Sequence, residues 1–178
     1  LHVCDRNLEQ IKTENITTHN LLVDVCMAAK YEGESIKAHY PKYDEQYPGS
    51  GSTMCTMLAR SFADIGDIIR GRDLYSGNKK EKKQREQLDD KLKEIFENIQ
   101  KENNSNLKSL TDDQIRECWW ALNRQEIWKA ITCDAPDYAK YFRGTCGNTK
   151  IPSKTPNQCR CDGDQVPTYF DYVPQYLR

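Results

Sequence analysis

The chain of 178 residues has no long apolar run. A membrane-spanning helix needs about 20 consecutive apolar residues, so nothing in the sequence predicts one. Net charge is also nearly absent, because 26 Lys and Arg oppose 27 Asp and Glu. No overall field therefore draws the chain to nucleic acid or anionic lipid. Apolar residues make up only 37%, which predicts a thin core that gains from covalent cross-links.

Catalytic motifs are missing as well. The sequence has no G-x-S-x-G, H-E-x-x-H or G-x-x-x-x-G-K-[ST] pattern. The run at 49–52 lacks the lysine and hydroxyl of a phosphate loop, so we interpret it as a linker. Asp64 and Asp67 could form a pair of catalytic carboxylates, but such pairs more often lie on a solvated face or partner arginines such as Arg60 and Arg70. We expect a non-enzymatic protein without a cofactor.

Cysteine is what the chain has in abundance, with eight residues. This density is typical of oxidised pairs in extracytoplasmic proteins. The absence of C-x-x-C spacing, and the clustering of His2, His19 and His39 near the start, disfavour a zinc site. Most cysteines are expected to be oxidised, and none to serve a metal or catalysis. The eight are Cys4, Cys26, Cys55, Cys118, Cys133, Cys146, Cys159 and Cys161.

Helical periodicity runs through most of the chain. Apolar residues recur every three or four positions, which predicts helices near 16–32, 53–70, 79–103 and 111–132. Gly33 and Gly71 follow the first two as natural stops, and Thr111 with Gln114 forms a capping-box pattern before the fourth. Residues 39–52 have turn chemistry, and 144–167 read as an irregular loop pinned by cysteines. The fold class predicted is all-α, a disulfide-linked helical bundle with negligible β content.

Two expectations concern the inside of this bundle. The stripe of the fourth helix contains Ile115, Trp119, Leu122, Ile127 and Ile131 with Trp120 and Trp128 beside it, and we expect the tryptophans to pack in the core. We also expect Cys118 or Cys133 to join Cys26 or Cys55, because each bond would link two helices. Cys159 and Cys161 should reach two different partners, since a ring between them would be strained.

A basic cluster offers a binding site. Lys79, Lys80, Lys82, Lys83 and Arg85 are crowded together, with Arg70 and Arg72 earlier in the chain as support. Clustered cations bind sulfated polysaccharide by multivalent charge contact. The alternative is a solvated helix face, because Glu81 interrupts the run and acidic residues follow it. Sequons at Asn15 and Asn103 fit an extracellular location, whereas nucleic acid is not an expected partner.

Several long motifs occur in one order. They include His2-Val3-Cys4-Asp5-Arg6-Asn7-Leu8, Cys26-Met27-Ala28-Ala29-Lys30-Tyr31-Glu32-Gly33 and Ala59-Arg60-Ser61-Phe62-Ala63-Asp64-Ile65-Gly66-Asp67-Ile68-Ile69-Arg70-Gly71. Downstream come Trp119-Trp120, Asn123-Arg124, Ile127-Trp128-Lys129-Ala130-Ile131-Thr132-Cys133 and the stretch 166–178. Together they resemble the Duffy-binding-like adhesion domains of malaria parasites, in particular the α class of Plasmodium falciparum erythrocyte membrane protein 1. The resemblance spans nearly the whole chain, although 73–110 and 134–158 carry no family motif.

The resemblance implies a helical fold of three subdomains. Residues 1–178 would supply the end of the first, the second helical subdomain, and the cysteine-rich start of the third, as a piece of a longer protein. Cys4 would then bond upstream, and one or both of Cys159 and Cys161 downstream. The parent proteins lie on the surface of the infected erythrocyte, held by a transmembrane segment outside this chain.

The implied function is adhesion to a red-cell or endothelial receptor, in rosetting or cytoadhesion. Sulfated glycosaminoglycans and surface proteins are the expected receptors. Adjacent domains of the parent protein and host antibodies are the other expected partners. The alternative is a structural or antigenically variable spacer, with neighbouring domains doing the binding.

Overall fold

The computed structural model describes residues 8, 10, 17–48, 53–74, 77–103, 107–147 and 150–178. These ranges contain four long helices, three one-turn 3-10 helices and no strand. The prediction of an all-α fold is thus confirmed. The elements are α2 (Thr18–Gln46), α3 (Met54–Ile69), α4 (Lys79–Glu102), α6 (Asp112–Ile131), η2 (Asp162–Asp164), η3 (Phe170–Tyr172) and η4 (Gln175–Leu177).

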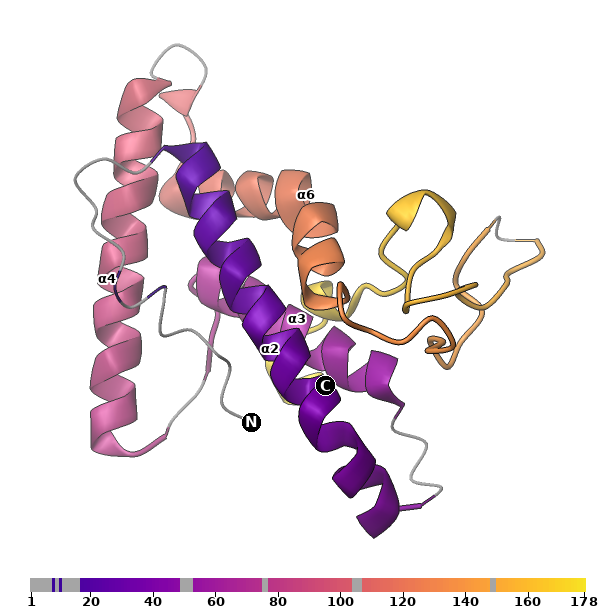
Figure 1. Ribbon diagram of the computed structural model, residues 1–178. Helices are drawn as coiled ribbons and strands as arrows, with labels where there is room; N and C mark the ends of the chain where they lie inside the picture. Colours follow the sequence, from indigo (N-terminus) through magenta and orange to yellow (C-terminus); the bar gives the residue numbers. More distant parts are fainter. Residues whose placement is uncertain are drawn as a thin grey trace.

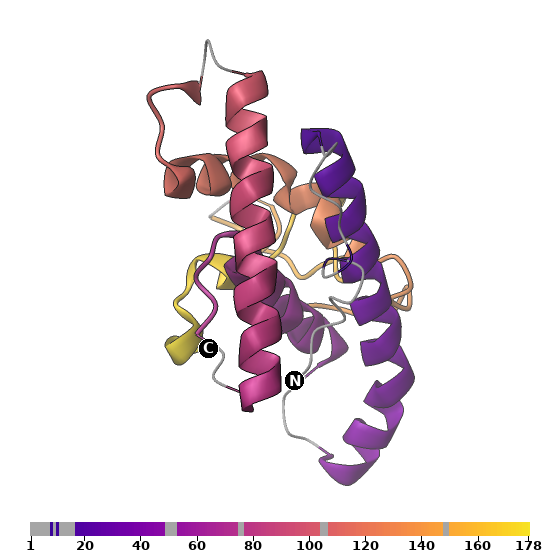
Figure 2. The same ribbon diagram turned by 90° about the vertical axis from the view of Figure 1, so that its left-hand side faces the viewer.

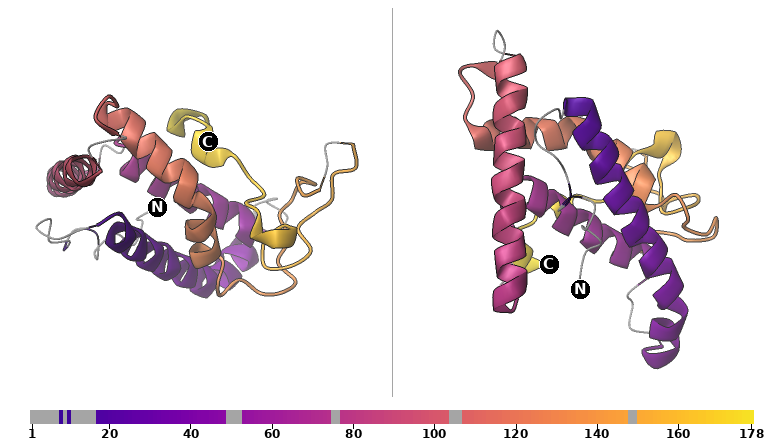
Figure 3. Two further views of the ribbon diagram at one scale, coloured as in Figure 1. Left: turned by 90° about the horizontal axis from the view of Figure 1, so that it is seen from above. Right: turned by 60° about the vertical axis from the view of Figure 1, so that its left-hand side comes forward.

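The long helix α2 crosses the bundle and packs mainly on α6, with α3 beside both (Figure 1). Helix α4 stands at one edge of the molecule and contacts α6 and, to a smaller extent, α3 (Figure 2). Seen from above, α4 is nearly end-on and clearly separate from α2 (left panel of Figure 3). The irregular residues 134–147 and 150–167 lie at the opposite edge from α4 (Figure 1). No helix in the described ranges has both the length and the apolar character to cross a membrane.

Local signals set most helix ends as expected. The predicted capping box forms at α6, where Gln114 N–H donates to Thr111 Oγ1 at 3.3 Å and Thr111 N–H donates to Gln114 Oε1 at 2.9 Å. After α3, Gly71 has φ +68°. The Gly71 N–H donates to the Ile68 carbonyl and the Arg72 N–H donates to the Asp67 carbonyl, the pattern of a Schellman motif. The predicted bounds of α3, α4 and α6 are confirmed within one residue or so.

The predicted end of α2 near Gly33 is wrong. The helix continues to Gln46, through Gly33 and Pro41, so part of the predicted turn region is helical. Gly33 is buried at the crossing with α6, where an added Cβ would lie 2.1 Å from the Ile131 carbonyl oxygen. Gly33 therefore allows α2 and α6 to pack closely and does not end helix α2. Pro41 lies inside the helix at an exposed position, where it supplies no backbone N–H to the turn before it.

Aromatic rings fill the centre of the bundle. Trp120 and Trp128 are fully buried, and their rings lie 5.2 and 5.1 Å from the Phe62 ring of α3. The core role predicted for the tryptophans is confirmed. Leu122, which the sequence placed in the same stripe, is 82% exposed, so that assignment is wrong. Trp120 and Trp128 lie in the middle of the buried face of α6, not at its margins as predicted. Leu122 therefore falls on the exposed side of the helix.

Two disulfides fix the irregular segment. Cys55 joins Cys159 and Cys146 joins Cys161. The prediction that Cys159 and Cys161 have two different partners is confirmed. The downstream bond that the resemblance implied for one or both of them is wrong, because both partners lie within this chain. The predicted bond from Cys118 or Cys133 to Cys26 or Cys55 is wrong, because Cys55 is used by Cys159 and the other three are free thiols. Two bonds thus use four of the seven described cysteines, and Cys4 lies outside the described residues.

Gly33→Ala should destabilise the protein by at least about 2 kcal/mol, because the new methyl group overlaps a backbone carbonyl that cannot rotate away. Helix propensity alone predicts the opposite, a gain of about 1 kcal/mol. Urea unfolding measures the difference, and Ala38→Gly at an exposed position of α2 is the control for propensity. A Gly33→Ala protein as stable as the parent would contradict this account of the helix crossing.

Candidate functional site

The first turns of α4 carry four exposed lysines, Lys79, Lys80, Lys82 and Lys83, which we call the lysine face. At about 100° per residue, they occupy the side of α4 opposite its buried stripe. That stripe contains Leu88, Leu92, Ile95, Phe96 and Ile99. Within the described part of the chain, none of the four lysines forms an ion pair. The lysine face is therefore a set of cations free to meet an outside anion.

The position of the lysine face disfavours a role in stability. The N-terminal end of a helix carries a partial positive charge, so cations there are unfavourable by a few tenths of a kcal/mol each at exposed sites. The start of α4 is stabilised instead by a capping box, in which Asn78 Oδ1 accepts from the Glu81 N–H at 3.0 Å and Glu81 Oε2 accepts from the Asn78 N–H at 3.1 Å. Glu81 is thus held by the cap, and its negative charge offsets part of the positive charge of the four lysines.

Arg85, predicted as part of the cluster, points elsewhere. Its side chain is 19% exposed, and its Nε lies 3.1 Å from Asp73 Oδ2. It lines a pocket of about 280 Å³ together with Lys82 of the lysine face and the carboxylates Asp73, Glu86 and Asp89. The three carboxylates make this pocket unsuitable for a polyanion. The structure thus brings four of the five clustered cations together and assigns Arg85 to an internal pair.

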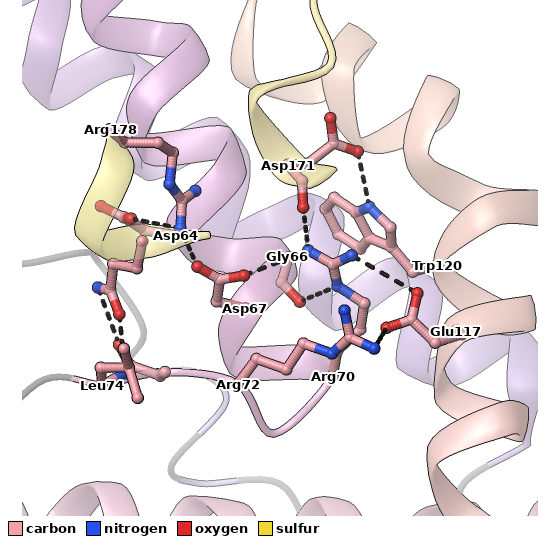
Figure 4. A network of polar contacts seen from close by, with 12 residues as sticks. Asp64, Gly66, Asp67, Arg70, Arg72, Leu74, Glu117, Trp120, Asp171 and Arg178 are labelled. Carbon is pink, nitrogen blue, oxygen red and sulfur yellow. Dashed lines mark hydrogen bonds and ion pairs between the residues drawn. The ribbon is translucent and has the colours of Figure 1, made fainter. Parts of the chain in front are cut away.

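The two supporting arginines have partners too. Arg72 is exposed, but its Nη2 lies 2.7 Å from Glu117 Oε1. Arg70 has a side chain only 1% exposed, and its Nη1 lies 3.6 Å from Glu117 Oε2. Its Nε donates to the Gly66 carbonyl at 2.9 Å and its Nη2 to Asp67 Oδ1 at 3.2 Å (Figure 4). Arg70 is therefore a structural residue that no ligand at the surface reaches.

Arg70 belongs to a buried polar network that sequence analysis missed. Its Nη2 also donates to the backbone carbonyl of Asp171 in η3. The Asp171 carboxylate accepts from Trp120 Nε1 at 2.9 Å, and from Arg124 Nε and Nη2 at 2.7 and 2.8 Å. Arg178 pairs with Asp67 and lies 3.7 Å from Asp64 Oδ1 (Figure 4). Periodicity carries no signal for these contacts, since they join positions about 50 to 110 residues apart.

The network settles the role of the carboxylate pair on α3. Asp67 partners Arg70, as expected, and Arg178 as well. Burial raises the pKa of Asp64 to about 6, although Arg178 acts in the opposite direction. Burial likewise raises the pKa of Asp67, against the effects of Arg178 and Arg70. Asp67 is buried in the contact of α3 with the C-terminal segment, whereas the Asp64 side chain is 28% exposed beside it. No metal-ligand group of three or more His, Cys, Asp or Glu occurs among the described residues.

Comparisons with known proteins agree on one family. The model of the Duffy binding domain matches residues 1–178. The NTS-DBL1(alpha-1) domain of Plasmodium falciparum membrane protein 1 (PfEMP1) from the varO strain is 39% identical, with TM-score 0.77. The comparison covers 99% of this chain and 40% of that one. The NTS-DBL1-alpha and CIDR-gamma double domain of the same protein gives 38% identity and TM-score 0.77, over 99% of this chain and 25% of that one.

A more distant neighbour is a DBLβ domain of PfEMP1 solved bound to ICAM-1. It is 29% identical, with TM-score 0.71, over 99% of this chain and 40% of that one. The chain thus spans less than half the length of the solved chains that it matches. Comparison with curated protein sequences gives no significant match.

The raised pKa of Asp64 predicts a pH effect. A carboxyl group whose pKa is 3.8 when unfolded and about 6 when folded binds its proton more tightly in the folded state. Its contribution to stability therefore grows as the pH falls from above 6 toward 4. Asp64→Asn should stabilise the protein at pH 7 and lose about half of this advantage at pH 5. Urea unfolding at both pH values measures it, with exposed Asp137→Asn as the control. An advantage that grows toward pH 5 would contradict the assignment.

Proposed function

Because the chain belongs to the Duffy binding domain family, we propose that it is a non-enzymatic adhesion module that contacts a receptor on a host cell. The fold match to PfEMP1 domains supports this, as does the PfEMP1 DBLβ domain solved bound to the host protein ICAM-1. The proposed location is the surface of the infected erythrocyte, as an extracellular part of a longer membrane protein. The three-subdomain division of residues 1–178 remains a prediction.

The lysine face is the observation that carries the finer proposal, binding of a sulfated glycosaminoglycan. In the part of the chain that the structure describes, the four lysines on α4 form no ion pair, and the adjacent acidic residues Asp73 and Glu81 contact Arg85 and the helix cap. Because the whole chain has a net charge of only −1, the attraction has to come from this local cluster. A regularly sulfated chain can contact several of the lysines at once, whereas an isolated anion contacts one.

A second candidate function, a structural or antigenic spacer, also has a specific observation in its favour. The chain corresponds to 40% of the solved DBL1(alpha-1) structure, so receptor contacts could lie in the remainder of such a domain. In that case the lysine face is a solvated surface that host antibodies meet. Both proposed functions predict a folded, extracellular module. They differ only in whether this chain itself binds a receptor.

Changing Lys79, Lys80, Lys82 and Lys83 together to Gln should sharply lower retention on heparin, without unfolding the protein. Single changes should have small effects, because each exposed ion pair contributes at most about 1 kcal/mol. The matched control changes four dispersed exposed lysines to Gln, Lys37, Lys42, Lys108 and Lys140. It alters the net charge equally but leaves the cluster. Equal loss of heparin retention in both variants would show that binding depends on the net charge of the chain and not on the lysine face.

Red-cell binding separates adhesion from the spacer function. The labelled 178-residue chain should bind intact erythrocytes, and added heparin should compete with this binding. The variant with the lysine face changed to Gln should bind less than the variant with dispersed lysine changes. Absence of binding by the parent chain, with a complete DBL1α domain binding in the same assay, would favour the spacer.

A further inference from the structure

A pocket of about 480 Å³ lies in the irregular part of the protein, away from the lysine face. Its walls are the segments 141–147 and 165–173, with Pro152 completing the lining. The segment 141–147 belongs to the edge of the molecule opposite α4, and 165–173 runs from that edge back to η3, which packs on α3 (Figure 1). The volume is within the usual range of small-ligand sites and corresponds to one or two sugar rings.

Cross-links hold the two walls in place. The disulfide Cys146–Cys161 and the paired backbone hydrogen bonds between Cys146 and Ser153, at 2.9 and 2.8 Å, fix one side. The Tyr141 hydroxyl donates to Thr168 Oγ1 at 3.2 Å across the pocket floor. Arg124 of α6 donates to the Thr168 carbonyl at 2.9 Å and anchors the other side to the helical bundle. A ligand would therefore meet a preformed site and would lose little affinity to the ordering of loops.

Among the described residues that line the pocket, Arg143 has the one charged side chain. Its guanidinium stacks on the Phe142 ring, 5.2 Å from the ring centroid, and is exposed to solvent. Stacking uses the face of the guanidinium and leaves the N–H groups at its edge available. No carboxylate lines the pocket or pairs with Arg143 in the described part of the chain. The charge of the pocket is thus complementary to one anionic group, and the planar guanidinium can hold a carboxylate with two N–H bonds.

The remaining lining combines aromatic faces with hydrogen-bonding groups. Phe142 and Tyr169 are 40% and 68% exposed, so both rings offer apolar faces at the pocket. Thr145 and Gln165 add a hydroxyl and an amide. A pyranose ring has one face of C–H groups that packs on an aromatic ring, and hydroxyls at its edge that use such polar groups. A peptide strand is less suited, because the backbone groups of Cys146 are already paired with Ser153.

We propose that this pocket binds a carboxylate-bearing sugar ring, with Arg143 holding the carboxylate and Phe142 packing on the ring. Such a ring occurs as the uronic acid of a glycosaminoglycan and as a terminal sialic acid, and the chemistry on the protein side is the same. This second site is independent of the lysine face, since the lysine face needs many sulfates and the pocket needs one carboxylate and a ring.

Titration of the ¹⁵N-labelled chain with three methyl glycosides tests the proposal. Methyl β-D-glucuronide and the methyl α-glycoside of N-acetylneuraminic acid are the acidic probes, and methyl β-D-glucoside is the neutral match of the first. Residues of 141–147 and 165–173 should shift with at least one acidic probe. The glucuronide should bind about threefold to fivefold more tightly than the glucoside if it is the sugar recognised, which is the effect of one exposed ion pair.

Variants locate the contact. Arg143→Gln should remove the preference for the acidic probe, and Phe142→Ala should weaken all binding at the pocket. Arg60→Gln, at an exposed arginine of α3, should change neither. The variant with four Gln at the lysine face should bind the monosaccharide normally, which keeps this test separate from the heparin test. No shifts in the pocket with either acid would overturn the proposal, as would an unchanged preference in Arg143→Gln. Equal affinity for glucoside and glucuronide would overturn it if the neuraminic acid glycoside also fails to bind.

Discussion

The buried carboxylate of Asp171 is the contact on which the arrangement of the C-terminal segment depends. Its side chain is completely buried, and its oxygens accept hydrogen bonds from Trp120 and from both ends of the Arg124 guanidinium. Desolvating a carboxylate costs several kcal/mol unless its oxygens are fully satisfied. The donors come from α6, so the segment can be buried only where α6 presents an indole N–H and a guanidinium together. This requirement specifies one position for residues 168–173.

The same contact orders its surroundings. Arg124 also donates a hydrogen bond to the carbonyl of Thr168, a residue that lines the pocket between 141–147 and 165–173. Trp120 packs on Phe62 of α3. The approach of Trp120 to α3 depends on Gly66, since an added Cβ would lie 2.7 Å from the indole ring. Arg70 then links α3 to the Asp171 backbone. The core, the buried charges and the pocket wall are therefore coupled through a few side chains, and a change at one of them is expected to affect all three.

The sequence allowed prediction of what depends on neighbours along the chain. Periodicity located α3, α4 and α6, and residues three apart predicted the cap at Thr111. Sequence-based prediction failed where the role of a residue is set by a partner far away in the chain. Gly33 resembles a helix stop, but it is needed for contact with Ile131, about a hundred positions away. Arg70 and Arg85 resemble members of a basic cluster, but Glu117, Asp67 and Asp73 use them. Charge counts along a sequence cannot distinguish a paired arginine from a free lysine.

The two proposed binding places share a structural property that the network lacks. The lysines of α4 project from the side opposite Leu88 and Leu92, and Arg143 and Phe142 lie at the rim of a pocket whose floor is Tyr141. Substitution at the four lysines or at Arg143 removes no core contact, and Phe142 contacts Tyr141 at the margin of the core. Substitution at Asp171, Gly66 or Gly33 instead disturbs the packing of helices. Recognition can therefore be altered without loss of the fold, because the residues that meet a ligand are not the residues that hold α3, α6 and the C-terminal segment together.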